Sequence, residues 1–294
     1  MRFREAKDSF IISREGKNCS SKTVEWYELM LNKFQNYLRE NDISFDKVQV
    51  NTLRLYLRYL SKDKKYSDKY LLGHFRVLKA FFNYLHFEKL IDENPAANLQ
   101  KPRQEQKLFP VLSPSQVRLI LDQPDRKTFE GYRNHIMIKV LFETGIRLQE
   151  LINIQLEHID LQQGCIRVFG KGNKERFVFM GVKLRQELHT YLIRRRHIAS
   201  SFLFVNQYGL PVYKRTFQTS LTLYGKNAGI TGVRVSPHTF RHTFATEFVK
   251  RDGNLKVLKE LLGHRDLETV EIYLTLDKDH LRQAFLKRSP LDNL

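Results

Sequence analysis

The first part of the chain arranges its apolar and polar positions with the period of a helix. Three sets of apolar residues recur at three- and four-residue spacing, which predicts three helices with one buried face each. The sets are Val24, Tyr27, Leu31, Phe34 and Leu38; Leu53, Tyr56 and Leu60; and Leu71, Phe75, Leu78, Phe82 and Leu85. Residues 1–91 are therefore expected to form a small helical domain. Lysine and arginine lie on its outer faces, although each such charge taken singly is also typical of ordinary solvated helix surface.

The helical periodicity stops over residues 92–112. The stretch from Asp92 to Pro114 holds four of the eight prolines of the chain and few apolar residues. Proline lacks a backbone donor and does not fit a helix interior, so this composition favours an extended connection. We expect an interdomain linker at 92–112, followed by a second domain at 113–294.

The second domain is expected to be mainly α-helical with one small β-sheet. "SPSQ", from Ser113, is a capping-box pattern with proline at the first helical position. The apolar stretch "HIMIKVLFETG" predicts a buried helix that ends at Gly145. "GCIRVFGKGNKERFVFMG" places two runs of β-branched and aromatic residues around a polar turn, which predicts a hairpin with Lys171 at its tip. From Lys183 onward the period is helical again, as far as the last segment, "DKDHLRQAFLKRS".

The composition narrows the class of partner. Lys and Arg number 50 against 32 Asp and Glu, for a formal net charge of +18. Such an excess favours binding to a polyanion, with nucleic acid the first candidate and an anionic membrane surface the second. No apolar run approaches the roughly 20 residues of a spanning helix, and "MRFREAKDSF" lacks the apolar core of a signal peptide. The isolated cysteines Cys19 and Cys165 suit a reducing cytoplasm.

A cluster of cationic and near-cationic side chains is predicted in "SPHTFRHTFATEF". Ser236 can cap a helix that begins at Pro237, so that His238, Arg241 and His242 lie on one face near its N-terminus, where backbone N–H groups favour an anion. Two histidines four positions apart also suit zinc, but the pattern lacks the glutamate of "HExxH" and has no cysteine or aspartate nearby. We therefore expect no metal and no cofactor. His242 by itself is more typical of a hydrogen-bonded interior histidine.

Two other segments carry an arginine, a histidine and a tyrosine that could act on the same anion. Arg147 follows the predicted helix end in "TGIRLQEL", and His264 follows a glycine nine positions before Tyr273. A lone histidine after glycine, or a lone tyrosine in an apolar helix, is usually structural. Together, two arginines, a hairpin lysine, histidines and a tyrosine can attack a DNA phosphodiester without a metal ion. Guanidinium groups bind phosphate oxygens, tyrosine is the nucleophile, and a lysine or histidine protonates the leaving oxygen.

In order and spacing, these motifs resemble those of the tyrosine site-specific recombinases, the Xer and phage-integrase group. "TGIRLQEL" resembles the first arginine box, "GKGNKER" the hairpin lysine, "HTFRH" the His-x-x-Arg box, and "LLGHRDLETVEIY" the last histidine and the nucleophile. The resemblance covers nearly the whole chain. It implies a SAM-like helical core-binding domain followed by a catalytic domain of the DNA breaking-rejoining fold.

The resemblance also implies a function, site-specific recombination that cleaves and rejoins DNA strands through a 3′-phosphotyrosyl intermediate. Arg147 and Arg241 would clamp the scissile phosphate. Lys171 would be the general acid for the departing 5′ oxygen, and Tyr273 would be the nucleophile. No ATP would be required, and the chain has no "GxxxxGK[ST]" phosphate loop.

Four further residues would support this chemistry by the same resemblance. His238 and His264 would assist proton transfer and bind phosphate oxygens. Glu150 and His242 would orient the arginines and their helix, a supporting role whose loss costs about tenfold to a hundredfold at comparable sites.

Two positions depart from the family pattern. Gln149 stands where a small residue is common in the first box, and "YLTL" occurs at Tyr273 where Thr-His frequently follows the tyrosine in the Xer branch. Both changes leave the chemistry intact but argue against a housekeeping resolvase of chromosome dimers. No N-terminal arm-binding domain is expected. A simple recombinase or a transposon-encoded integrase or resolvase, acting on a mobile element or a replicon dimer, is therefore favoured.

The expected partner is double-stranded DNA carrying recombination sites, bound by a homotetramer on two paired sites. In relatives the C-terminal helix docks on the neighbouring protomer, and "DKDHLRQAFLKRSP" has Leu281, Ala284 and Phe285 on one face. The alternative is that this face folds back on its own domain. Two other functional classes stay open, a non-catalytic sequence-specific DNA-binding regulator and a type IB topoisomerase. The target sequence and any need for accessory proteins are also open.

Overall fold

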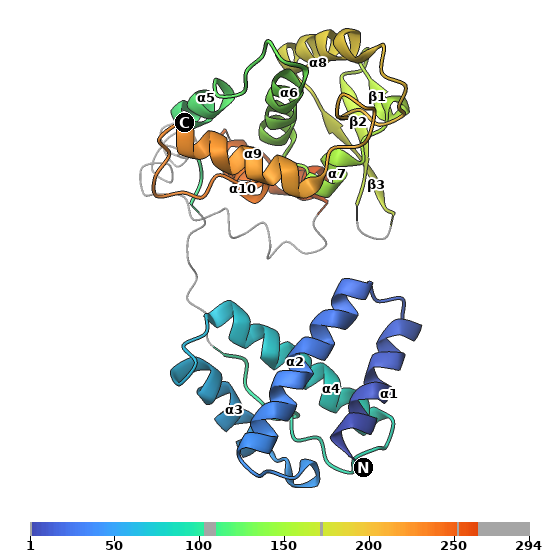
Figure 1. Cartoon of the computed structure of the whole chain (residues 1–294), viewed down its shortest axis with the longest axis vertical. Helices are drawn as coiled ribbons and strands as arrows, with labels where there is room; N and C mark the ends of the chain where they lie inside the picture. The colour runs from blue at the N-terminus through green and yellow to red at the C-terminus, as the bar shows by residue number, and fades with distance from the viewer. Residues whose placement is uncertain (1, 103–109, 171–172, 252, 264–294) are drawn as a thin grey trace, which may run out of the picture. The chain divides into compact units, whose positions relative to one another are not determined.

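The computed structural model describes residues 2–102, 110–170, 173–251 and 253–263. The chain divides into two compact units, residues 1–106 and 107–294, and each has its own hydrophobic core (Figure 1). The described residues are mainly helical, with a small antiparallel sheet in the second unit. The predicted fold class is confirmed.

The first unit packs its helices around an aromatic core. Its elements are α1 (Phe3–Gly16), α2 (Ser21–Glu40), the 3₁₀ turn η1 (Phe45–Lys47), α3 (Val50–Lys62) and α4 (Asp68–Phe87). The three predicted apolar sets fall on α2, α3 and α4 and face the core. Helix α1 was not predicted, although Phe3, Ala6 and Phe10 are buried on one face of it at helical spacing.

Aromatic side chains fill the centre of this first core. Phe10 meets Phe81 edge to face, with ring centroids 5.5 Å apart, and Phe34 lies 5.0 Å from Tyr56. Such ring pairs stabilise a core beyond the area that they bury. The four helices named above are thus fixed to one another by large, fully buried side chains.

Parts of the segment 92–112 pack into the two cores. Ala96 and Leu99 are buried with the first unit, where Lys79 donates a hydrogen bond to the Ala97 carbonyl at 2.8 Å. Leu112 is buried in the second unit and its N–H donates to the Thr243 hydroxyl at 3.0 Å. A segment without helical period can still bury single apolar side chains, and these anchor each described end of the segment to one unit.

The second unit surrounds a buried helix with further helices and the sheet. Its elements are α5 (Pro114–Leu121), α6 (Phe129–Thr144), α7 (Leu148–Ile152), η2 (Leu156–His158), β1 (Ile159–Asp160), β2 (Cys165–Phe169), β3 (Glu175–Phe179), α8 (Val182–Arg195), α9 (Lys214–Asn227), α10 (Pro237–Lys250) and α11 (Leu255–Leu262). Helix α6 packs against α8 and α10 and is buried on nearly all sides. Its buried residues are mostly apolar, and the buried Arg133 donates hydrogen bonds to the Asn134 side chain.

The sheet contains the predicted hairpin. Strand β2 is central, with β1 and β3 antiparallel on either side, and the β2–β3 register pairs Cys165 with Phe179 and Phe169 with Glu175. The hairpin is confirmed, while the short strand β1 was not predicted. Lys171, the expected tip residue, lies outside the described residues.

The predicted helix boundaries are also confirmed. Ser113 and Ser236 cap α5 and α10, each accepting a backbone N–H at 3.2 Å through its hydroxyl oxygen. Gly145 ends α6 with φ +60°, a conformation that strains any other residue. A Cβ at Gly145 would also lie 2.4 Å from a ring carbon of Phe244, so the absence of a side chain lets α10 approach this turn.

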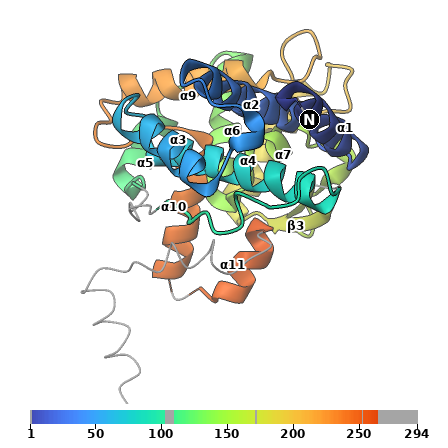
Figure 2. The ribbon, with the colours of Figure 1, turned by 90° about the horizontal axis from the view of Figure 1, so that it is seen from below.

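Helix α11 lies beside the C-terminal part of α10 and forms a small separate core with it (Figure 2). Ala245 and Val249 of α10 are buried there against Leu258 and Leu262 of α11. Gly263 ends α11 with φ +62°. In the described part of the chain, every helix is too short or too polar to cross a membrane.

Candidate active site

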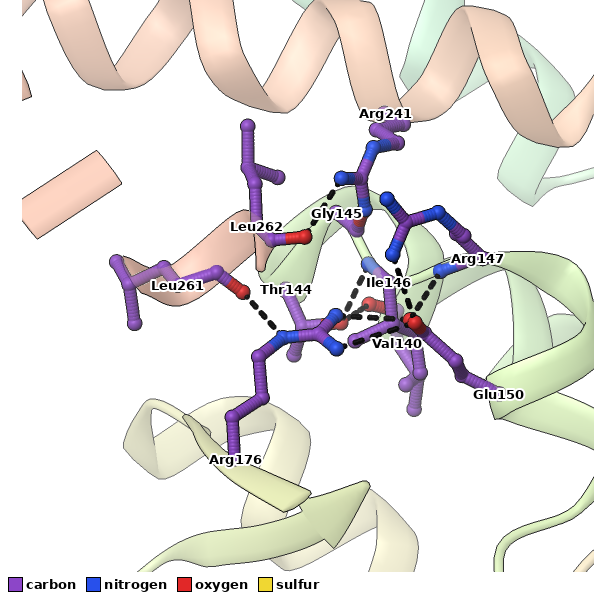
Figure 3. Close-up of polar contacts among 10 residues, drawn as sticks. All are labelled: Val140, Thr144, Gly145, Ile146, Arg147, Glu150, Arg176, Arg241, Leu261 and Leu262. Atoms are coloured by element: carbon purple, nitrogen blue, oxygen red, sulfur yellow. Dashed lines mark hydrogen bonds and ion pairs between the residues drawn. The ribbon is translucent and has the colours of Figure 1, made fainter. Parts of the chain in front are cut away.

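The candidate site is built around the turn that ends α6. Gly145 closes that helix, and two residues later Arg147 directly precedes α7. The first N–H groups of a helix have no partner within it. Here the Glu150 carboxylate accepts the Arg147 backbone N–H at 2.8 Å and also the Arg147 Nη1 group at 2.9 Å (Figure 3). Backbone and side chain of Arg147 are therefore held by one acidic residue.

The Glu150 carboxylate is buried and binds a second arginine. Its side chain is 4% exposed, whereas that of Arg147 is 42% exposed. Arg176, from β3, donates Nη1 to Oε1 at 3.1 Å and Nη2 to Oε2 at 2.8 Å. Two parallel charge-assisted bonds of this kind are the strongest geometry for an arginine–carboxylate pair.

The arginines keep the buried Glu150 carboxyl ionised. Burial by itself would raise the pKa of Glu150. Hydrogen bonds from Arg176 and from the Arg147 backbone N–H, together with the charge of Arg176, outweigh that effect and lower its pKa below the ordinary value of 4.5. Glu150 is therefore an anion at neutral pH, as its position beside Arg147 requires.

Sequence reasoning missed Arg176. It is the last residue of "GKGNKER", a motif in which the sequence predicts a role for the lysine alone. The signal that could have found it is the alternation along β3, where Glu175, Phe177 and Phe179 are exposed while Arg176 and Val178 face inward. An arginine on the inward face of a strand needs a buried partner.

Arg241 occupies the centre of the site from α10. It is 5% exposed and donates Nη1 to the Gly145 carbonyl and Nη2 to the Leu262 carbonyl, both at 2.7 Å. These carbonyls lie at the C-terminal ends of α6 and α11, where the helix dipole favours a cation. One guanidinium therefore joins two helix ends (Figure 3).

The two histidines of α10 lie on either side of Arg241 in the sequence. His238 is exposed in the first turn of the helix and His242 is partly buried. Burial, and then the charges of His238 and Arg241, lower the pKa of His242 below 6.5. His242 is therefore neutral at neutral pH.

The structure brings Arg147, Glu150 and Arg241 together although Arg241 lies far along the chain (Figure 3). Lys171, His264 and Tyr273 lie outside the described residues. Within the described ranges, no group of three or more His, Cys, Asp or Glu side chains could hold a metal ion.

The charges of this cluster favour an anionic ligand. The guanidinium groups of Arg147 and Arg176 bind one carboxylate, and Arg241 adds a third positive charge at the Gly145 turn, so positive charge is in excess. Of the three, only Arg147 is exposed to a substantial degree. A guanidinium carries five N–H donors in a fixed plane that matches two oxygens of a phosphate. With Glu150 holding one side of it, Arg147 can direct its other donors toward such a group.

Comparison with known sequences covers both units. Residues 110–280 match the Phage integrase family, and residues 3–101 match the Phage integrase SAM-like domain. The chain is 34% identical over 282 residues to the tyrosine recombinase XerC of Anoxybacillus flavithermus, with 93% of each chain covered. It is 32% identical over 280 residues to the tyrosine recombinase XerD of Staphylococcus aureus, covering 93% of this chain and 94% of the relative.

Solved structures share the fold. The XerH site-specific recombinase, bound to a palindromic difH substrate in a post-cleavage complex, superimposes with a TM-score of 0.78 at 24% identity, covering 92% of this chain and 81% of the other. The Tn1549 transposon integrase in complex with transposon right-end DNA gives a TM-score of 0.74 at 21% identity, with 98% and 99% covered. At these identities the likeness supports the fold.

We expect Glu150→Gln to destabilise the second unit by about 3 kcal/mol at neutral pH, because two arginines then lose a buried anionic partner. Folding lowers the pKa of Glu150 below its unfolded-state value, which is near 4.5. The ionised carboxylate therefore stabilises the fold fully above that value, and the stabilisation is lost as the pH falls through the folded-state pKa. Urea unfolding of both proteins should therefore show a difference that shrinks below pH 4.5.

The matched control is Glu175→Gln, which removes an acid that is 58% exposed and 4.0 Å from Arg167. It should change stability little at either pH. A Glu150→Gln penalty that stays the same from neutral to acidic pH would contradict the role of the carboxylate charge.

Proposed function

The chain belongs to the phage integrase family of tyrosine recombinases, and we propose that it cleaves the scissile strand with Tyr273 while Arg147 and Arg241 bind the phosphate. It is a site-specific DNA recombinase that transfers strands through a covalent protein–DNA link. The observation that carries the proposed residue roles is the convergence of Arg147, Glu150 and Arg241 at the Gly145 turn.

The proposed first step is a transesterification. The Tyr273 oxygen attacks phosphorus, the bond from phosphorus to the 5′ oxygen breaks, and a 3′-phosphotyrosyl link forms. Lys171 donates a proton to the departing 5′ oxygen, with His238 and His264 assisting proton transfer and binding phosphate oxygens. Attack by a 5′-hydroxyl on the phosphotyrosine reverses the step. Because one phosphodiester replaces another, no ATP is required.

The two arginines stabilise the negative charge that develops on the phosphate during cleavage. The pentacoordinate transition state carries more negative charge on its non-bridging oxygens than the ground state. Arg147, exposed and held by Glu150, and Arg241, fixed between two helix ends, place positive charge where that increase occurs. His242 supports Arg241 as a neutral neighbour on the same helix.

We also propose that the protein acts in the cytoplasm as a homotetramer on two paired DNA sites. Its isolated cysteines fit a reducing compartment, since Cys19 and Cys165 are both free. The XerH structure contains its difH substrate and the Tn1549 integrase structure contains transposon-end DNA. By analogy, this recombinase acts on paired sites of a mobile element or a replicon dimer, for integration, excision or resolution.

We expect wild-type protein to form a covalent adduct with a nicked duplex that carries the candidate site, and Tyr273→Phe to form none. The nick lets the short fragment with the released 5′-hydroxyl diffuse away, so the covalent intermediate accumulates. The adduct is detected after denaturation as a labelled DNA strand that migrates with protein. Tight, salt-sensitive binding without an adduct in the wild type would favour a DNA-binding regulator instead.

Two controls sharpen this trapping experiment. Tyr208→Phe removes the hydroxyl of a tyrosine that is 78% exposed in the same unit and should leave the adduct unchanged. A duplex with a scrambled site should give no adduct. Equal trapping on both duplexes would favour a topoisomerase without a preferred site.

We expect Arg147→Ala and Arg241→Ala each to lower the single-turnover cleavage rate by roughly 10²–10³, as loss of an oxyanion donor does. Their effects on stability should differ. Arg147→Ala should lower the melting temperature only a little, because its side chain is 42% exposed and Glu150 keeps the bonds from Arg176 and from the backbone N–H of residue 147. Arg241→Ala should lower it, because two buried carbonyls lose their donor. Weaker DNA binding with an unchanged cleavage rate would assign either arginine to docking.

We expect truncation after Leu276 to leave binding to a single site intact and to abolish synapsis of two sites, if the C-terminal segment docks on a neighbouring protomer. Gel mobility of one-site and two-site complexes measures both properties. Normal synapsis by the truncated protein would refute the docking role.

A further inference from the structure

Arg176 joins three parts of the second unit. From β3 it forms the paired bonds to Glu150, at 3.1 and 2.8 Å, and its Nε donates to the Leu261 carbonyl at 2.8 Å. The hairpin, the turn that holds Arg147, and the last turn of α11 therefore meet at one guanidinium (Figure 3). Its side chain is only 12% exposed.

The surroundings of Arg176 leave its guanidinium little freedom. A Cβ on Gly263 would lie 3.2 Å from its Nη1 atom, and a Cβ on Gly170 would lie 3.7 Å from the same atom. The first distance is tighter than an ordinary contact and the second is van der Waals contact. The side chain is thus packed between two glycines, one at the end of α11 and one at the end of β2.

The base of the hairpin is regular around this contact. Val168 pairs with Arg176 across the two strands, and the Gly170 N–H donates to the Lys174 carbonyl at 2.8 Å. The two strands are therefore joined by regular pairing up to this point, and Arg176 links them to Glu150. In the sequence, Lys171 lies between β2 and β3, and His264 and Tyr273 follow α11.

We propose that Arg176 is a positioning residue of the cleavage reaction, which holds the hairpin and the end of α11 against Glu150 and thereby sets the placement of Arg147. This inference rests on the proposed function. It adds a residue that would not touch the phosphate. Lysine in its place would keep the charge but lose the planar fork that reaches both carboxylate oxygens and the Leu261 carbonyl at once.

The test compares wild type, Arg176→Met, Arg176→Lys, Glu150→Gln and the Arg176→Met/Glu150→Gln double variant. Each is measured for its dissociation constant with the duplex, its melting temperature, and its cleavage rate on the nicked duplex at saturating protein. Arg176→Met should lower the rate about tenfold to a hundredfold, as loss of an outer supporting residue commonly does, while the dissociation constant changes little. Arg176→Lys, the safer variant for folding, should recover part of the rate.

The double variant distinguishes positioning from general destabilisation. If Arg176 acts through Glu150, Arg176→Met should cost much less in the Glu150→Gln background than in the wild type. The matched control is Arg167→Met, which removes an arginine of the same hairpin that is 39% exposed and 4.0 Å from Glu175. Its cleavage rate should equal that of the wild type.

Two results would overturn this inference and leave the proposed function standing. In the first, the wild type is active and both Arg176 variants cleave at the wild-type rate. In the second, the loss in the double variant equals the product of the losses in the two single variants. A wild type that binds DNA but forms no adduct would overturn the proposed function and this inference together. A loss of rate that follows only the fraction of folded protein would assign Arg176 to stability.

Discussion

The buried carboxylate of Glu150 is the interaction on which the candidate site depends. A buried charge is stable only when it is paired and hydrogen-bonded, and this one accepts bonds from the Arg147 backbone, the Arg147 side chain and both ends of the Arg176 fork. The four donors come from two residues, Arg147 directly before α7 and Arg176 on β3. Their meeting point therefore fixes the start of α7 against the hairpin.

The two arginines proposed to bind phosphate are held in different ways. Arg147 is exposed, and one acidic side chain fixes its orientation. Arg241 is buried and donates two hydrogen bonds, to the carbonyls that end α6 and α11. Strand transfer between two phosphodiesters needs positive charge held in place more than it needs an energy source. A site made of anchored guanidinium groups fits that requirement, because their reorganisation is prevented before the substrate binds.

The end of α11 is bound in a related way. The carbonyls of Leu261 and Leu262 lie in its last turn and accept hydrogen bonds from Arg176 of β3 and Arg241 of α10. The last carbonyls of a helix have no partner within it, and the dipole there favours cations. The two arginines supply hydrogen-bond donors to these carbonyls and positive charge at this end of the helix. They also fix the point from which the chain continues toward His264 and Tyr273.

The sequence by itself determined most of the fold and part of the site. Helical periods predicted α2, α3 and α4, and the caps Ser113, Ser236 and Gly145 located helix ends. The ordered motifs indicated the recombinase family. All these signals lie in neighbouring residues. Only the tertiary structure decided that Arg176 pairs with Glu150, that Arg241 joins two helix ends, and that Ala96 and Leu99 pack into the first core. Each of those contacts joins residues from different elements that are distant in the chain. Whether they meet depends on how whole helices and strands pack, which no local sequence pattern predicts.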